Sequence, residues 1–206
     1  MSGMVPIGVF LCFHLFANSV AMFSVENYNL TINALRGMPF VEYIEWIVLY
    51  LPILFHALYG MVIYTTAKPN QWQYSHLENW RYILQRITGV IALVYIWYHI
   101  MQFKQVEGLD YNYVAKSLAG WQSISWLPEI PYINPFSIYW FYIIGLTAVT
   151  YHFANGIWGF CITWGITIGR KSQVFMSYVA VLVFITLTTI GVLTINHLAD
   201  AGQALL

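Results

Sequence analysis

The stretch LPILFHALYG, residues 51–60, places His56 inside an apolar run. Three further apolar stretches repeat this pattern around His14, His99 and His152, at successive intervals of 42, 43 and 53 residues. A membrane-spanning helix uses ~20 residues and its connection uses the rest, so the spacing predicts one imidazole in each of four membrane crossings. Because ionisable side chains are costly inside a membrane, the four histidines predict a shared functional site.

The composition also indicates a membrane protein. Of the 206 residues, 60% are hydrophobic and 8% are charged, whereas soluble domains carry roughly 25% charged residues. The formal net charge of zero excludes the strongly basic surface expected of a nucleic-acid-binding protein. Cys12 and Cys161 lie in apolar runs and form no C-x-x-C motif, so neither iron–sulfur ligation nor covalently attached haem is predicted.

Five apolar runs are long enough to cross a bilayer, and they predict an all-α membrane protein with a single domain, residues 1–206. The predicted spans are residues 5–23, 44–66, 83–103, 137–167 and 174–195. The first run has no basic region before it and no small-residue cleavage site. We therefore expect it to be retained as a helix and not removed as a signal peptide.

The charges of the connections predict the orientation. If successive connections alternate between the two sides, one side carries the larger basic group, formed by Lys68, Arg81, Arg86, Arg170 and Lys171. The other side carries Arg36, Lys104 and Lys116, together with most of the acidic residues. The positive-inside rule makes the first side cytoplasmic and places the amino terminus inside.

The two connections on the outer side have different character. The first, residues 24–43, contains a predicted short helix that ends near Arg36, where Gly37 and Pro39 follow. The second is longer and rich in aromatic residues, which are expected to lie along the lipid–water boundary. These aromatic residues are Tyr111, Tyr113, Trp121 and Trp126.

Histidines on neighbouring helices are an economical way for a bundle to hold a metal cofactor. Neutral imidazole ligates haem iron, and one imidazole on each side of the porphyrin gives a haem suited to electron transfer. Four such ligands predict two b-type haems, although the spacing alone leaves open which histidines pair. The remaining two histidines, His76 and His197, are interpreted as a solvated loop residue and an interfacial residue.

Small residues near the histidines are consistent with a flat porphyrin. Small residues follow two of the histidines by three or four positions on the same helical face: Gly60 after His56, and Asn155 and Gly156 after His152. Gly89 leaves room on one face of the third span. Trp80, Gln85 and Arg86 precede the third span, where propionate groups need polar partners. The alternative is that the small residues make ordinary helix–helix contacts.

Long, ordered segments resemble one family, the dihaem cytochrome b subunit of bacterial succinate:menaquinone oxidoreductase. The resemblance covers nearly the whole chain. The matching segments are SGMVPIGVFLCFHL (2–15), LPILFHALYG (51–60), QYSHLENWRYILQRITG (73–89), WYH (97–99), YHFANGIWGFCITWGIT (151–167) and RKSQ (170–173).

The resemblance implies a five-helix anchor in the bacterial cytoplasmic membrane with its amino terminus in the cytoplasm. It implies that His56 and His152 hold a proximal haem near the cytoplasm, and that His14 and His99 hold a distal haem. It also implies two partner subunits: a flavoprotein with FAD that oxidises succinate, and an iron–sulfur protein that passes on the electrons. Menaquinone would be reduced in the membrane region, and this chain would carry no dicarboxylate chemistry.

The quinone site is less well defined by the sequence. Glu26, Arg36 and Glu45 in the first outer connection are candidates to exchange protons with a quinone or to hydrogen-bond its carbonyl groups, and solvated loop charges are the alternative. Related quinol:fumarate reductases have a glutamate implicated in transmembrane proton movement where this chain has Thr150. The threonine therefore argues against the quinol:fumarate reductase function. A menaquinol:fumarate reductase anchor and a haem-free transporter or structural anchor remain the alternative functions.

Overall fold

The computed structural model describes residues 1–66, 68–120 and 135–206, and every regular element in these ranges is a helix. This confirms the all-α prediction. The helices are α1 (Pro6–Ser19), η1 (Val20–Met22), α2 (Val25–Arg36), α3 (Val41–Ile44), the π-helical turn η2 (Glu45–Tyr50), α4 (Leu51–Thr65), α5 (Leu77–Phe103), α6 (Tyr111–Leu118), α7 (Pro135–Thr163) and α8 (Arg170–Leu205).

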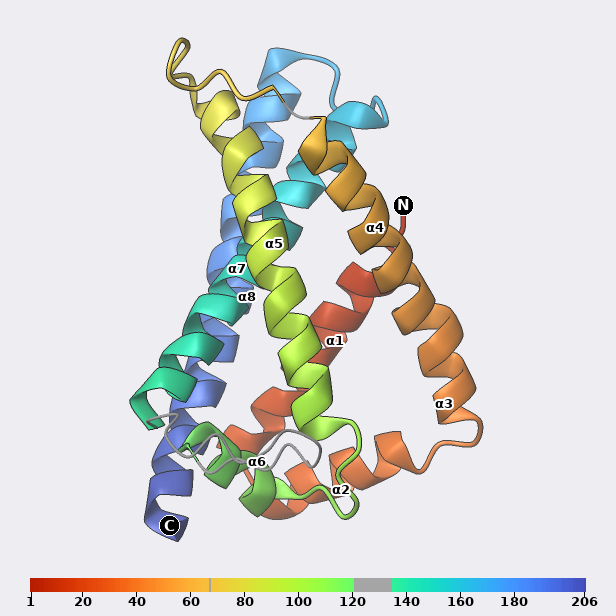
Figure 1. Cartoon of the computed structure of the whole chain (residues 1–206), viewed down its shortest axis with the longest axis vertical. Coiled ribbons are helices and arrows are strands. Elements are labelled where there is room, and N and C mark those ends of the chain that lie inside the picture. Colours follow the sequence, from red (N-terminus) through yellow and green to blue (C-terminus); the bar gives the residue numbers. More distant parts are fainter. Residues whose placement is uncertain (67, 121–134) are drawn as a thin grey trace.

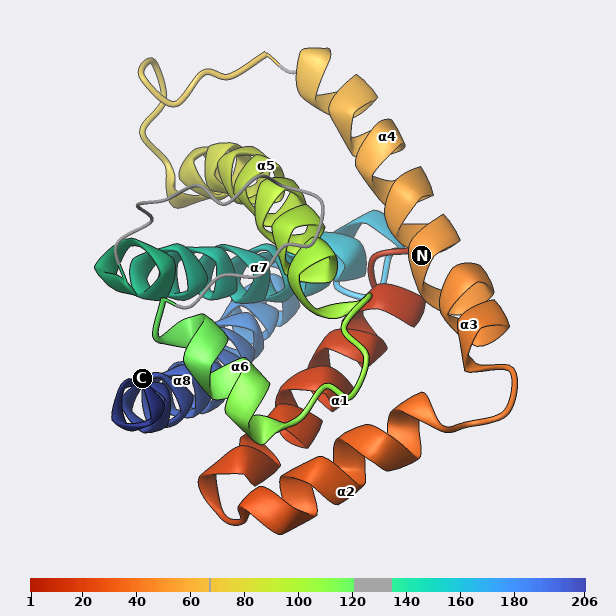
Figure 2. The same ribbon diagram turned by 60° about the horizontal axis from the view of Figure 1, so that its bottom comes forward.

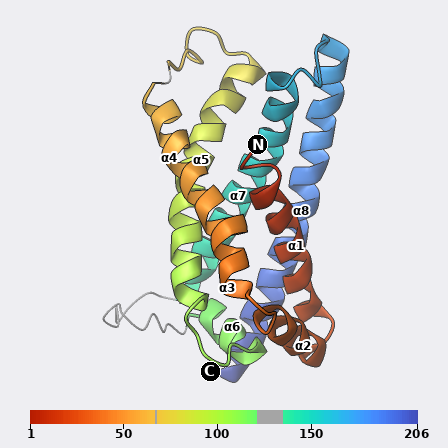
Figure 3. The same ribbon diagram turned by 90° about the vertical axis from the view of Figure 1, so that its right-hand side faces the viewer.

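Three long helices form the centre of the structure, with α7 packed against both α5 and α8 (Figure 1). Helix α1 packs on α8 and lies between this group and α4 (Figure 2). Helix α4 stands at the edge, and none of its residues is buried. The short helices α2 and α6 lie together at one end of the bundle with the carboxyl terminus (Figure 3), hereafter the α2/α6 end. The turn between α7 and α8 lies at the opposite end.

Each of the five predicted ranges lies mostly within helix, but the fourth, 137–167, is too long: α7 ends at Thr163 and the turn to α8 follows, because Gly165 adopts a left-handed conformation. Among the described residues, three helices have the length and apolar character of a membrane span: Val41–Thr65, Leu77–Phe103 and Arg170–Leu205. The segment Pro6–Met22 is a shorter apolar helix, and α7 is 29 residues long. Helix α8 is longer than the predicted range 174–195, since it has 36 residues. At 1.5 Å per residue it reaches about 54 Å, so its ends extend well beyond a hydrocarbon core of about 30 Å.

Local sequence signals set several helix ends. The short helix predicted in the first outer connection is confirmed as α2, which begins where the Ser24 hydroxyl accepts a hydrogen bond from the Asn27 N–H at 3.2 Å. Asp110 caps α6 in the same way, accepting from the Tyr113 N–H at 2.8 Å. After α7, Gly165 adopts φ +67°, and this left-handed residue turns the chain back so that α8 packs along α7.

Glycines allow the long helices to approach closely, as is common for helices in membranes. A Cβ atom on Gly145 of α7 would lie 2.1 Å from the Tyr95 ring of α5, and one on Gly191 of α8 would lie 2.6 Å from Leu146 of α7. Each glycine therefore makes room for a large side chain on the neighbouring helix. The same relation holds between Gly8 of α1 and Phe153 of α7.

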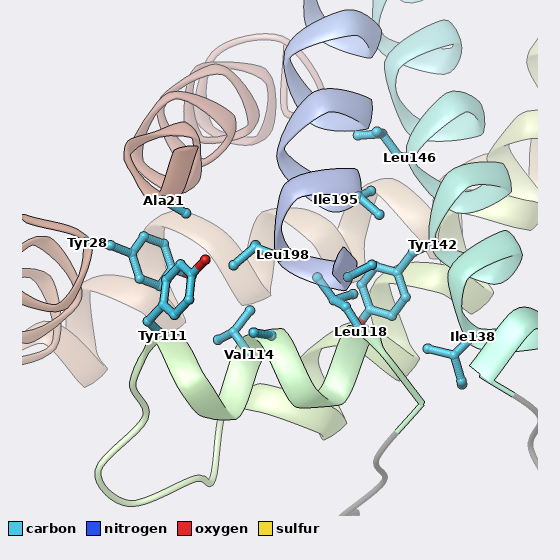
Figure 4. Packing of buried hydrophobic residues seen from close by; sticks show 12 residues of the cluster. Ala21, Tyr28, Tyr111, Val114, Leu118, Ile138, Tyr142, Leu146, Ile195 and Leu198 are labelled. Carbon is cyan, nitrogen blue, oxygen red and sulfur yellow. The ribbon is translucent and has the colours of Figure 1, made fainter. Parts of the chain in front are cut away.

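The buried hydrophobic cluster lies at the α2/α6 end, where α6 packs on α8 (Figure 4). Leu118 and Leu198 are 4% and 2% exposed, and full burial of side chains of this size stabilises the fold by roughly 1.5–3 kcal/mol each relative to water. Other members of the cluster are Ala21, Tyr28, Tyr111, Val114, Ala115, Ile138, Tyr142, Leu146, Ile195 and Ala199.

Tyr111 corrects one expectation from the sequence. It was predicted at the lipid–water boundary, but it is only 5% exposed and packs edge-on against Tyr28 at 5.8 Å. Burial raises the pKa of the Tyr111 phenol, so the phenol keeps its proton and can donate to His197 Nε2 at 3.1 Å. Trp121 and Trp126, predicted at the same boundary, lie outside the described residues.

We predict that Gly202→Ala destabilises the α2/α6 end. A Cβ atom at Gly202 would lie 2.0 Å from the carbonyl oxygen of Ala115, so α6 must move away from α8. The expected cost is about 1–3 kcal/mol, which outweighs the helix propensity of up to about 1 kcal/mol that alanine adds. Denaturant unfolding of the purified protein measures the loss. Ala204→Val, which adds bulk at an exposed position of the same helix, should leave stability unchanged.

Candidate functional site

The four histidines of the apolar runs lie in two pairs. The imidazole of His56 on α4 faces that of His152 on α7, with ring centroids 6.0 Å apart and the planes at 86°. The imidazole of His14 on α1 faces that of His99 on α5, with centroids 5.6 Å apart and also at 86°. Each pair therefore joins two helices that are distant in sequence. His99 is four residues from the end of α5 nearest α2 and α6, whereas His152 is nearer the opposite end.

The geometry of both pairs suits two ligands on opposite sides of one metal ion. Imidazole nitrogens bind first-row metals such as zinc at about 2 Å, so two trans nitrogens lie about 4 Å apart and their ring centroids about 6 Å apart. Both observed separations are close to this value. Among the described residues no group of three or more His, Cys, Asp or Glu side chains could hold a metal ion. Two-ligand coordination with the remaining positions filled by a porphyrin is consistent with this arrangement.

His152 is oriented by a hydrogen-bond network between α5 and α7. Its Nδ1 lies 3.0 Å from the main-chain carbonyl oxygen of Gln85, which can only accept, so Nδ1 carries the proton and Nε2 is free to ligate. The Gln85 side-chain amide donates to the carbonyl of His152 at 3.1 Å, and Asn155 donates to Gln85 Oε1 at 2.7 Å. Gln85 and Asn155, predicted as cofactor contacts, thus hold the histidine in place.

Three glycines predicted to make room for a porphyrin differ in their surroundings. A Cβ atom on Gly89 would lie 3.0 Å from the His152 ring, so the close approach of α5 to this imidazole requires glycine. Nothing lies within 4 Å of such an atom on Gly60, which leaves open space one helical turn after His56. A Cβ atom on Gly156 would make only an ordinary contact with Gln85, at 3.6 Å.

Gly3 is an unpredicted neighbour of His56. A Cβ atom on Gly3 would lie 2.7 Å from His56 Cε1, so the segment before α1 passes directly over the imidazole. The sequence carried no signal for this contact, because residues 3 and 56 meet only when α1 and α4 pack together.

The His14–His99 pair lies in aromatic surroundings. Tyr95 stacks on His99 at 5.8 Å, and Phe103 contacts its ring edge at 5.2 Å. The phenol oxygen of Tyr142 lies 3.5 Å from His99 Nδ1. On the other side, Phe10 stacks on His14 at 5.4 Å. These rings cover part of both imidazoles, which remain half-buried.

Asn18 and Tyr28 stand behind His14. The Asn18 side-chain amide donates to the carbonyl oxygen of His14 at 2.9 Å, and the Tyr28 hydroxyl donates to Asn18 Oδ1 at 3.1 Å. Burial raises the pKa of Tyr28, and neighbouring Tyr111 raises it further, so the phenol remains a donor. Asn18 lies one helical turn from its histidine, which is the signal that could have identified it.

The predicted propionate partners lie near the start of α5. Arg86 packs its guanidinium on the Tyr82 ring at 3.4 Å and donates to the Tyr82 carbonyl at 2.8 Å, whereas its buried Nε has no hydrogen-bond partner. An unpaired buried donor fits a site for a carboxylate group. Trp80 is 37% exposed and packs edge-on against Trp72.

The three quinone candidates occupy different surroundings. Arg36 donates to main-chain carbonyls at the end of α5, the shortest bond being 2.7 Å to Val106. Glu45, the first residue of the π-helical turn η2, forms an ion pair with Lys104. Glu26 is exposed in the first turn of α2. Arg36 and Glu45 are therefore both attached to the segment just after His99, and Glu26 is apart from them.

These features define a class: a helical membrane protein in which two histidine pairs bridge neighbouring helices. Comparison with known proteins gives the family. Residues 61–192 match the model of the succinate dehydrogenase/fumarate reductase transmembrane subunit. The succinate dehydrogenase cytochrome b558 subunit of Bacillus subtilis (strain 168) is 33% identical over 189 residues, which are 92% of this chain and 88% of that protein. The chain belongs to the succinate dehydrogenase/fumarate reductase transmembrane subunit family.

We predict that Asn155→Ala destabilises the α5–α7 interface. The substitution leaves Gln85 Oε1 without its 2.7 Å donor in a half-buried position, which should cost about 1 kcal/mol. The midpoint of unfolding in denaturant is the measurement. Asn33→Ala, which removes the same group from an exposed position on α2, serves as the control. Equal stability of the two variants would contradict a role for the network.

Proposed function

We propose that this chain is the haem-bearing membrane anchor of a succinate:menaquinone oxidoreductase, and that it passes electrons from an iron–sulfur subunit to menaquinone. The observation that carries the proposal is the pairing of four imidazoles, with ring centroids 5.6 Å and 6.0 Å apart, in a member of this family. Each pair would hold one haem. The name of the Bacillus subtilis relative, a cytochrome b558, adds support for haem as the cofactor.

In this proposal His56 and His152 ligate the proximal haem, and His14 and His99 ligate the distal haem. A bound b-type haem carries one electron at a time between the partner subunit and the quinone. The Gln85 carbonyl keeps the proton of His152 on Nδ1, so that Nε2 would be available to bind the haem iron. Arg86 offers an unpaired Nε to a propionate, Gly89 lets α5 approach the His152 ring, and Gly60 leaves space beside His56.

The same proposal assigns the membrane orientation and the partners. The basic residues at the end of the bundle that holds the α7–α8 turn make that end cytoplasmic, with the amino terminus inside. A flavoprotein with FAD and an iron–sulfur protein dock at this end, in the bacterial cytoplasmic membrane. The flavoprotein oxidises succinate, and the iron–sulfur protein delivers the electrons to the proximal site. The flavoprotein performs the dicarboxylate chemistry, and five spans of this chain provide the path across the lipid.

We propose the quinone site near the distal pair, at the α2/α6 end. Reduction of a quinone to a quinol takes two electrons and two protons, so an acidic or hydrogen-bonding group must lie close by. Glu45 is the first residue of a π-helical turn, a local irregularity that is frequent at functional sites. Its partner Lys104 lies on the segment after His99, and the Arg36 guanidinium of α2 donates to the Val106 carbonyl of the same segment. Exposed Glu26 is the candidate for proton exchange with water.

Two alternative functions differ from this proposal in one feature each. In a menaquinol:fumarate reductase anchor, electrons flow in the opposite direction. Thr150 argues against a proton path at its position, because its hydroxyl is fully buried and bonded to Thr188 at 2.8 Å, with no ionisable group. A haem-free structural anchor or transporter would use the histidines only as helix–helix hydrogen-bond partners. His152 and His99 do have such partners between α5 and α7, but no hydrogen bond among the described residues joins the two rings of either pair, so this alternative leaves the pairing of the imidazoles without a role.

The first test is haem content in single histidine variants. We expect two b-type haems per chain in the purified complex, and one in each of His14→Ala, His56→Ala, His99→Ala and His152→Ala, because a haem with one axial ligand removed binds weakly. Pyridine haemochrome quantification against protein measures the stoichiometry. His76→Ala and His197→Ala, which alter the two histidines outside the pairs, are matched controls and should keep both haems.

Two results would contradict the proposal. A wild-type complex with no haem would favour the structural anchor. Loss of both haems in every single variant, with the complex still assembled, would show that the pairs do not bind independently. Variants of one pair should also share one reduced-minus-oxidised spectrum, since both remove the same haem.

We predict that Glu45→Gln raises the KM for a menaquinone analogue and leaves haem content unchanged. The amide keeps the shape of the side chain but loses the charge that pairs with Lys104, so quinone binding weakens while the histidine pairs are undisturbed. Steady-state kinetics with the assembled complex measure this. Glu107→Gln, on the same side of the bundle but exposed, is the control. An unchanged KM for Glu45→Gln would remove this residue from the site.

A further inference from the structure

Behind His99 lies a buried pair of polar side chains that the proposed function does not yet use. Tyr142 of α7 is 3% exposed and Gln102 of α5 is 1% exposed, so both belong to the interior of the protein. Polar groups are costly in such positions unless they are hydrogen-bonded. Gln102 lies one helical turn after His99 on α5, and Tyr142 faces it from α7. The buried pair is therefore placed to act on His99.

The hydrogen bonds of this pair have a defined direction. The Tyr142 hydroxyl donates to Oε1 of Gln102, and its oxygen lies 3.5 Å from Nδ1 of His99. A phenol has a single proton. Because Gln102 takes that proton, the Tyr142 oxygen has only lone pairs to offer His99 and must act as an acceptor toward it. His99 Nδ1 then carries its proton toward Tyr142, and Nε2 is left without one.

The packing keeps this arrangement in place. The Tyr142 ring lies 6.0 Å from the His99 ring and 5.4 Å from the Tyr95 ring, both at steep angles. Tyr95 itself stacks on His99 and sits against Gly145, where any Cβ atom would collide with its ring. The phenol cannot turn away from His99 without disturbing these contacts. Gln102 Nε2 is also buried and has no partner among the described residues, so Oε1 is the atom that fixes this side chain.

From this geometry we propose that Tyr142 is a positioning residue for the distal axial ligand, and that Gln102 acts through it. The Tyr142 oxygen accepts a hydrogen bond from the Nδ1–H of His99. This bond fixes the tautomer, the ring orientation and the basicity of His99. A histidine that shares its proton with an acceptor is a stronger donor to the metal and stabilises the oxidised state. The inference rests on the proposed function, because it requires His99 to be a haem ligand.

The two haem sites would then be tuned by different acceptors. His152 donates to the main-chain carbonyl of Gln85, which no side-chain substitution can remove. His99 depends on a side chain, so its acceptor can be removed by a single substitution. The Thr88 hydroxyl also lies 3.5 Å from the same His152 nitrogen, but the 3.0 Å contact with the Gln85 carbonyl persists in any side-chain variant. Only at His99 can one substitution remove the acceptor completely.

The test is potentiometric titration of both haems in the complete Tyr142→Phe complex. Loss of the acceptor should raise the distal midpoint potential by up to about 59 mV. For a one-electron couple this is a tenfold change in the equilibrium constant. The proximal potential should stay unchanged. His14→Ala, which removes the distal haem, identifies which of the two titration steps is distal.

Tyr139→Phe is the matched control. Tyr139 lies on the same helix, one turn before Tyr142, and donates to Asn196 Oδ1 on α8 at 2.7 Å, away from the histidines. It loses an equivalent phenol hydrogen bond, so a purely structural effect would appear in both variants. Equal shifts in the two variants, or no distal shift in Tyr142→Phe, would overturn the proposal.

Gln102→Leu provides the second variant. Without Gln102 the Tyr142 proton is free, so the phenol becomes a poorer acceptor and the distal potential should rise by a smaller amount. The double variant should match Tyr142→Phe alone, since Gln102 acts through the tyrosine. If Tyr142→Phe fails to assemble, an unchanged distal potential in Gln102→Leu overturns the inference. Two haems in wild type with no distal shift in Tyr142→Phe would refute the role of Tyr142 alone. Retention of both haems in His99→Ala would instead refute the ligand assignment on which the inference rests.

Discussion

An imidazole inside a membrane helix must find a partner beyond the helix backbone, and this constraint organises the chain. The backbone groups of a helix are already used within the helix, so an imidazole needs side-chain or interhelical partners, such as Asn18 one turn from His14. Each ring also faces a second imidazole from a distant part of the sequence, at 6.0 Å and 5.6 Å. The relative positions of α1, α4, α5 and α7 must all be compatible with these two contacts.

The surrounding packing is uneven, and the difference suits the two sites. Helices α5, α7 and α8 are held by glycine contacts such as Gly145 against Tyr95 and Gly191 against Leu146. Helix α4 has no buried residue, so His56 is carried by the least embedded helix. At the α2/α6 end, the buried cluster and the Arg36 bonds to α5 anchor the outer connection close to His99. One pair therefore lies against a tightly packed region, and the other spans a more open interface.

The network around each histidine is built from unlike groups. His152 uses a main-chain carbonyl, His99 lies beside a phenol, and the His14 carbonyl accepts a bond from an amide. Similar ligands can therefore carry different redox properties, because the second partner of an imidazole changes its strength as a donor. The partners of His152 and His99 come from the packing of α5 against α7, whereas the Asn18 donor lies on the same helix as His14.

The composition, the apolar runs and the one-per-run histidines were sufficient to predict an all-α membrane protein, and Gly37 and Pro39 correctly placed the end of the short helix α2, whereas its start at the Ser24 cap came from the structure. These properties depend on hydropathy and on residues within one or two helical turns. The same reasoning placed Tyr111 at the lipid boundary, although it is buried against Tyr28, because an aromatic residue suits either position. It could not identify Tyr142 or Gly3 as neighbours of His99 and His56, nor decide which histidines face each other from spacing alone. Only the crossing of α5 with α7 and of α1 with α4 brings those atoms within reach, because contacts between residues far apart in sequence are determined by how helix surfaces pack and not by local pattern.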